Sequence, residues 1–143
     1  MNLTTIATHE PATAPASRRR YVRDGLVAGV VAGGATTAVA ALAHGAGVSL
    51  DVPRADDKSI PVLAFAQVTV VAALIGLALA RVLLRRSTRP GVIFTRITVA
   101  LTLASLIPPV LADANPSTKA LLIVTHLIAG AIVIPVVATR LER

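Results

Sequence analysis

The sequence contains no cysteine and no tryptophan, and only one tyrosine and two phenylalanines. Without cysteine the chain cannot form disulfides, thiolate metal sites, Fe–S clusters or thiol redox centres. This excludes the small four-span membrane proteins that oxidise thiols. The scarcity of aromatic residues leaves little material for the Trp and Tyr belts that mark membrane interfaces. We therefore expect arginine side chains to provide most of the interfacial anchoring.

Acidic residues are missing from four long apolar runs, which contain no charged residue of either sign: 25–50, 59–80, 97–112 and 120–139. Small four-span proton-coupled drug exporters depend on a membrane-embedded Glu, so the chain does not fit that class. A phosphate-binding glycine loop, an H-E-x-x-H motif and a nucleophile triad are also absent from the sequence. We predict that the protein is not an enzyme and that it has no cofactor or metal site.

The apolar runs predict membrane spans. About 20 apolar residues are needed to cross a hydrocarbon core of roughly 30 Å, and the third run reaches this length if Arg96 lies at an interface. The mean hydropathy of +0.76 is too high for a soluble domain of 143 residues. We predict an all-α, integral-membrane, four-helix up-down bundle within one domain, residues 21–143. The expected spans are about 25–49, 60–84, 92–112 and 119–139, and residues 1–20 are expected to form a disordered basic cytoplasmic tail.

The charge is distributed by membrane side. If the four predicted spans cross the membrane in alternating directions, eleven of the 14 basic residues lie on one side of the membrane. Four of the seven acidic residues lie in the loops on the other side. The positive-inside rule then places both termini in the cytoplasm of a multi-pass cell-membrane protein. The net charge of +7 is thus explained without nucleic acid, which we exclude as a partner. Anionic lipid headgroups are the expected counter-ions of the cytoplasmic arginines.

Residues 17–23 resemble the twin-arginine export motif S-R-R-x-F-L-K, and Ala41-Leu42-Ala43 resembles an A-x-A cleavage site. A cleaved export signal is therefore an alternative interpretation of the first run. That run continues past the proposed cleavage site to Leu50, and three more apolar runs follow it. We therefore expect an uncleaved first span.

Glycine in the first span follows a packing pattern. Gly25, Gly29 and Gly33 repeat at intervals of four, and G-x-x-x-G spacing forms a groove in which another helix backbone can approach closely. Gly130 lies on a similar small-residue face of the fourth span. The pattern does not distinguish another span of this chain from a second copy as the packing partner.

Polar residues form one candidate intramembrane site. His44, Gln67, Ser105 and His126 each fall roughly 10 Å from the outer boundary at 1.5 Å per residue. Both histidines lie on small-residue faces, so we predict that they point into the bundle and approach each other or share a partner. A site for a ligand or a proton is one interpretation. Ordinary hydrogen bonding between helices and a lipid-facing position are the alternatives.

The third span carries hydroxyl groups along one helical face, at Thr95, Thr98, Thr102 and Ser105. We expect this face to form a seam between helices, or else to line a small water-filled cavity. Pro108-Pro109 removes two backbone donors and predicts a kink or a helix end near the outer boundary. Ser117 or Thr118 is predicted to cap the fourth span.

Several features resemble one known family: the basic N-terminal flank, the segment 44–53, Thr118-Lys119 leading to Thr125-His126, and Pro135 in the fourth span. The chain resembles an uncharacterised group of small four-helix membrane proteins of actinobacteria, a domain of unknown function numbered 6069. The resemblance covers about residues 20–140. It implies the four-helix membrane fold and carries no assigned activity.

Two functions remain open from the sequence. The first is a structural or interaction protein, such as an accessory subunit of a membrane complex or a homo-oligomer. The second is a small transporter or channel whose outer half uses His44, Gln67 and His126.

Overall fold

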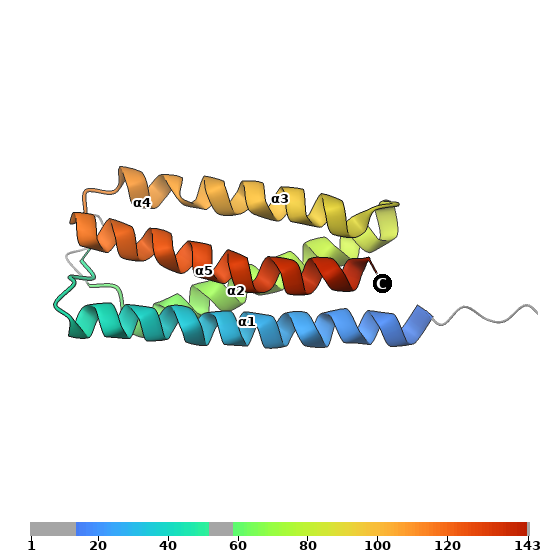
Figure 1. The fold of residues 1–143 in the computed structure, drawn as a ribbon, viewed down its shortest axis with the longest axis horizontal. Coiled ribbons are helices and arrows are strands. Elements are labelled where there is room, and N and C mark those ends of the chain that lie inside the picture. Colours follow the sequence, from blue (N-terminus) through green and yellow to red (C-terminus); the bar gives the residue numbers. More distant parts are fainter. Residues whose placement is uncertain (1–13, 52–58, 143) are drawn as a thin grey trace, which may run out of the picture.

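The structure is a computed structural model that describes residues 14–51 and 59–142. The described residues form five helices, whose axes are roughly aligned in one bundle (Figure 1). They are α1 (Ala14–Gly45), α2 (Val62–Arg86), α3 (Pro90–Ser105), α4 (Ile107–Leu111) and α5 (Pro116–Leu141). α3 and the short α4 run in line, so together they form the third span, Pro90–Leu111. Within these two described ranges, four helical units are long and apolar enough to cross a membrane. The prediction of an all-α four-span bundle is confirmed.

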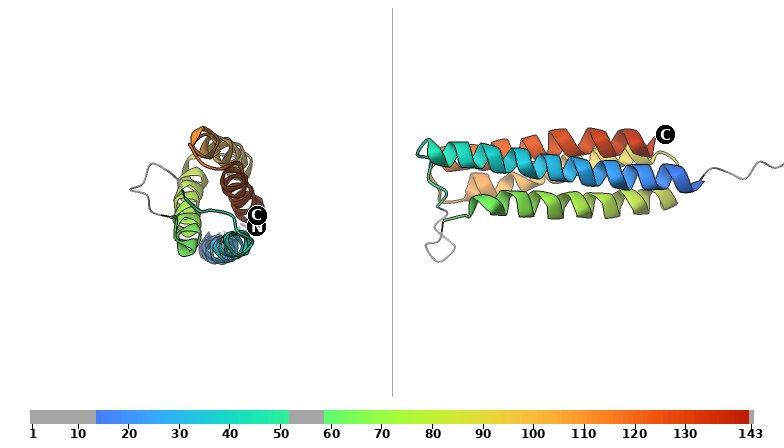
Figure 2. Two further views of the ribbon diagram at one scale, coloured as in Figure 1. Left: turned by 90° about the vertical axis from the view of Figure 1, so that its left-hand side faces the viewer. Right: turned by 90° about the horizontal axis from the view of Figure 1, so that it is seen from below.

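Successive spans run in opposite directions (Figure 1), as an up-down bundle requires. α1 packs against both α2 and α5, whereas α3 packs chiefly against α5. Figure 2 shows the same order end-on, with α3 on the side of the bundle away from α1. Both ends of the chain's helical part and the α2–α3 turn lie at one end of the bundle, which we call the arginine end. The α1–α2 and α4–α5 connections lie at the other, which we call the loop end.

The first span ends earlier than the predicted residue 49, because the chain leaves the helix at a glycine. Gly47 has φ +88°, the left-handed conformation that glycine adopts without steric cost. The amide of Val48 donates to the carbonyl of Ala43 and that of Gly47 to the carbonyl of His44. These two bonds form a Schellman motif, which closes the helix. α1 therefore ends at Gly45, and His44 lies in its last turn.

At its other end α1 begins at Ala14. Residues 14–20, which were predicted to belong to the disordered tail, are therefore helical in the structure. Residues 1–13 of the predicted tail lie outside the described residues. So do residues 52–58 of the first outer loop, with Arg54, Asp56 and Asp57.

The third span breaks as Pro108-Pro109 predicts. α3 ends at Ser105, and α4 begins at Ile107 after a single non-helical residue. The amide of Leu106 bonds to the carbonyl of Leu103, one residue closer than in an α-helix. Proline has no amide hydrogen, so the carbonyls four residues before each proline lose their helical donors.

Two apolar clusters hold the bundle together. One lies at the arginine end and joins all four spans through Tyr21, Leu77, Ala80, Phe94, Val137 and Leu141. The other lies at the loop end and contains Ala40, Leu50, Phe65 and Leu121. All three aromatic residues of the chain are therefore buried in the core, and none belongs to an interfacial belt.

Candidate functional site: a side-opening cavity beside His126

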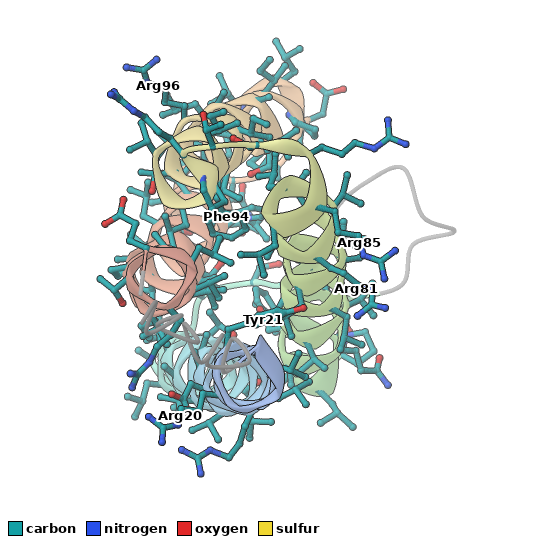
Figure 3. All side chains as sticks on the ribbon, turned by 90° about the vertical axis from the view of Figure 1, so that its right-hand side faces the viewer. Arg20, Tyr21, Arg81, Arg85, Phe94 and Arg96 are labelled. Carbon is teal, nitrogen blue, oxygen red and sulfur yellow. The ribbon has the colours of Figure 1, made fainter. Side chains whose placement is uncertain are left out.

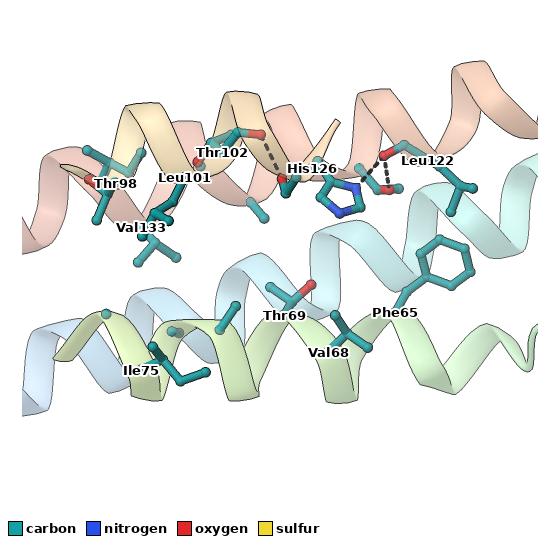
Figure 4. Close-up of a pocket in the computed structure, with 18 of the residues that line it drawn as sticks. Phe65, Val68, Thr69, Ile75, Thr98, Leu101, Thr102, Leu122, His126 and Val133 are labelled. Carbon is teal, nitrogen blue, oxygen red and sulfur yellow. Dashed lines mark hydrogen bonds between the residues drawn. The ribbon is translucent and has the colours of Figure 1, made fainter. Parts of the chain in front are cut away.

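A cavity of about 560 Å³ lies between α2, α3 and α5. Its lining is mostly aliphatic and aromatic, with hydroxyl groups and one imidazole (Figure 4). Three large hydrophobic side chains of the lining are also exposed on the outside of the bundle: Val68 and Ile75 on α2, each 64%, and Leu101 on α3, 57%. The cavity therefore opens sideways between α2 and α3.

His126 is the polar centre of this cavity. Its Nδ1 atom lies 2.6 Å from the carbonyl oxygen of Leu122, one turn earlier in α5. A carbonyl oxygen only accepts hydrogen bonds, so Nδ1 carries the proton and donates. In the neutral imidazole, Nε2 is then an acceptor. Figure 4 shows the ring between α5 and α2, within the cavity.

Four of the five hydroxyl groups around the cavity, all except that of Thr102, already use their protons. Thr98 donates to the carbonyl of Phe94, Ser105 to that of Thr102, and Thr125 to that of Leu122, all within their own helices. Thr69 pairs with Thr36 of α1 at 3.2 Å, and Thr36 itself donates to the carbonyl of Gly33. What these side chains present to the cavity is therefore oxygen lone pairs and methyl groups.

The structure brings together two of the four residues predicted to form a polar site. Ser105 and His126 both line the cavity, whereas His44 and Gln67 are exposed on the outside of the bundle. Gln67 is two residues after the buried Phe65, and two residues correspond to about 200° around a helix. His44 is exposed in the last turn of α1, where its Nδ1 lies 3.4 Å from the carbonyl of Val48. It therefore lies one residue before the end of α1 and not several residues inside the helix, as the residue count assumed.

The four predicted packing glycines lie at contacts between helices. A Cβ atom at Gly25 would meet Leu77, one at Gly29 would lie 2.8 Å from the Cβ of Ala73, and one at Gly33 would lie 3.3 Å from Val70. The glycine row of α1 thus faces α2 of the same chain. At Gly130 of α5 an added Cβ would lie 3.3 Å from the side chain of Thr102 on α3.

Besides the contact between Thr36 and Thr69, two polar contacts between distant segments were not predicted from the sequence. Asp24 of α1 is only 15% exposed, and its carboxylate lies 2.9 Å from Nε of Arg140 on α5 and 3.0 Å from Nε of Arg23. A lone acid among arginines at the start of a span was the available signal. Thr118 was predicted as a cap, but it donates instead to the carbonyl of Ser49, at 2.6 Å. Asn115 occupies the N-cap position of α5 because the helix begins at Pro116.

The model of one protein family, described as "Family of unknown function (DUF6069)", matches residues 16–143. No curated protein and no solved structure matches the chain.

Proposed function

We infer that this chain, which belongs to the Family of unknown function (DUF6069), is a multi-pass protein of the cytoplasmic membrane with both termini in the cytoplasm. An actinobacterial source is consistent with its preference for Ala, Val, Leu and Arg over Ile, Phe and Lys.

The arginine end supports this orientation. Arg20, Arg81, Arg85 and Arg96 are exposed there, and Figure 3 shows them pointing outward around the bundle while Tyr21 and Phe94 point inward. A ring of cations outside an apolar core suits the cytoplasmic leaflet, where anionic headgroups attract each Lys or Arg by about 1 kcal/mol. Anionic lipids are thus the partners that we propose for this end.

We propose that the protein acts by binding, as a structural or accessory subunit in a membrane complex, and not as an enzyme. One observation supports this most directly: His126 and four of the five hydroxyl side chains of the cavity bond to carbonyls within their own helices or to a neighbouring hydroxyl. A nucleophile, a base and an orienting group bonded to one another would be the arrangement for nucleophilic catalysis. The partner is a second copy of the chain or another membrane protein.

The orientation is tested by single cysteines, which the cysteine-free sequence allows. A membrane-impermeant maleimide should label cysteines at Ser59 and Ser117 in intact cells, because both lie at the loop end. A cysteine at Ser87, in the α2–α3 turn, should react only after permeabilisation. Labelling at Ser87 without the other two would reverse the orientation. Protein sequencing that begins directly after Ala43 would restore the interpretation of a cleaved export signal.

The second candidate function is transport, and the cavity with His126 favours it. The two functions are separated by purifying the protein in mild detergent and identifying what is retained. A fixed protein partner, in constant ratio, is the outcome expected for an accessory subunit. For a transporter, the purified protein alone should catalyse flux in proteoliposomes with a sharp pH dependence that the His126→Phe variant lacks. Recovery of a lone chain that shows such flux would contradict the accessory function.

A further inference from the structure

We propose that the cavity binds one neutral long-chain lipid whose hydroxyl head group donates a hydrogen bond to His126. The head would lie between His126 and Ser105, and the apolar chain would extend towards Phe94. This inference rests on the proposed membrane location, but not on the accessory role.

The shape of the cavity selects a chain molecule. On α2 its lining runs from Ala64 to Leu79, which at 1.5 Å per residue spans about 22 Å along the helix. The volume of about 560 Å³ is therefore spread along an elongated space that follows the bundle. A hydrocarbon chain, with carbon contacts near 4 Å, fits such a space.

The polar groups of the cavity select the head group. Nε2 of His126 and Oγ of Ser105 are acceptors, because the protons of Nδ1 and Oγ are donated to carbonyls. A ligand that bonds to these two atoms must therefore supply the donor. Within the described parts of the chain, 14–51 and 59–142, the residues that line the cavity carry no formal charge. An ionic head group would enter without a counter-ion at a high desolvation cost, so an uncharged O–H group is favoured.

The distribution of polar and apolar groups along the cavity matches an amphiphile in the outer leaflet. His126 and Ser105 lie towards the loop end, which we place outside, and Leu79, Phe94 and Val133 line the opposite, apolar end. A lipid of the outer leaflet has the same direction, with its head outward and its chain inward. The exposed rim of Val68, Ile75 and Leu101 would let it enter sideways from the bilayer.

The test uses the full chain in lipid nanodiscs and a photoreactive long-chain alcohol as the probe. Crosslinks should map to α2, α3 and α5 at residues that line the cavity. The methyl ether of the same alcohol, which has no donor, should bind about tenfold more weakly, the scale of one lost neutral hydrogen bond. The His126→Phe variant should bind the alcohol about tenfold more weakly and the ether with unchanged affinity. His44→Phe, at an exposed histidine, is the matched control and should behave like the unmodified chain.

A second variant blocks the apolar end of the cavity, where the hydrocarbon chain of the lipid would lie. Among the described residues, a Cβ atom at Gly76 would meet only Phe94, at an ordinary contact of 4.0 Å, so Gly76→Leu should fill the cavity without separating the helices. It should abolish saturable binding of both probes. Gly34→Leu is the matched control, because an added Cβ there meets no atom of the described chain within 4 Å. Equal affinity of alcohol and ether for the unmodified chain would overturn the proposal. So would unchanged binding by a folded Gly76→Leu variant, or crosslinks confined to α1.

The hydroxyl can come from two sources, an aliphatic alcohol or the phenolic ring of an isoprenoid quinol. Competition against the photoreactive alcohol separates them, because the true source should displace the probe at the lower concentration. Displacement by neither would overturn the proposal. Failure of these experiments leaves the cysteine labelling and the partner purification unaffected, so the proposed function is judged separately.

Discussion

Replacing Phe94 with alanine should lower the free energy of unfolding by about 3 kcal/mol, the lower end of the range for buried Phe→Ala changes. Phe94 is 0% exposed and packs in the cluster at the arginine end, with Tyr21, Leu77 and Val137. The low end applies because the hydrophobic effect contributes little to the association of helices in a membrane, where lipid tails are as apolar as the side chains. What is lost is mainly van der Waals contact around the void.

The measurement is thermal or denaturant unfolding in one detergent, compared with Val99→Ala. Val99 lies on the same helix and is 42% exposed, so its truncation should cost less than about 0.5 kcal/mol. Phe94→Leu should fall between the two, because it keeps most of the side-chain volume. Equal stability of Phe94→Ala and Val99→Ala would show that Phe94 does not organise the core.

Leucine at Gly29 is the second change with a large expected effect, a loss of about 1–3 kcal/mol from overpacking. Even the first added carbon would lie 2.8 Å from the Cβ of Ala73. Both carbons are attached directly to helix backbones, so neither can rotate away, and α1 and α2 must separate. The separation would also strain the contact between Thr36 and Thr69, two turns further along the same seam.

Gly34→Leu is again the matched control, because it makes the same chemical change on the same helix where an added Cβ meets open space within the described residues. Leucine also favours helix over glycine by about 0.8 kcal/mol, so this variant should be neutral or slightly stabilised. The difference between the two melting curves therefore isolates the packing term. Identical melting of the two variants would mean that Gly29 does not form a close contact.

The candidate site was only partly predictable, and two residues show why. Helical spacing placed His126 on the same face of its helix as Ala129 and Gly130, and all three residues line the cavity in the structure. For His44 the residue count assumed that the helix continued to residue 49, whereas α1 ends at Gly45 and His44 lies in its last turn. The pair Gly45 and Gly47, followed by Val48, was the available signal for an earlier end.

The sequence by itself determined the four spans, the break at Pro108-Pro109 and the glycine row, because these depend on local composition and helical spacing. Only the tertiary structure decided that the row faces α2, that Asp24 pairs with Arg140, and that α2, α3 and α5 enclose a cavity. These outcomes depend on which helices become neighbours and how closely they approach. In a membrane, apolar side chains suit lipid and protein alike, so an apolar pattern alone does not show which face of a span meets another helix.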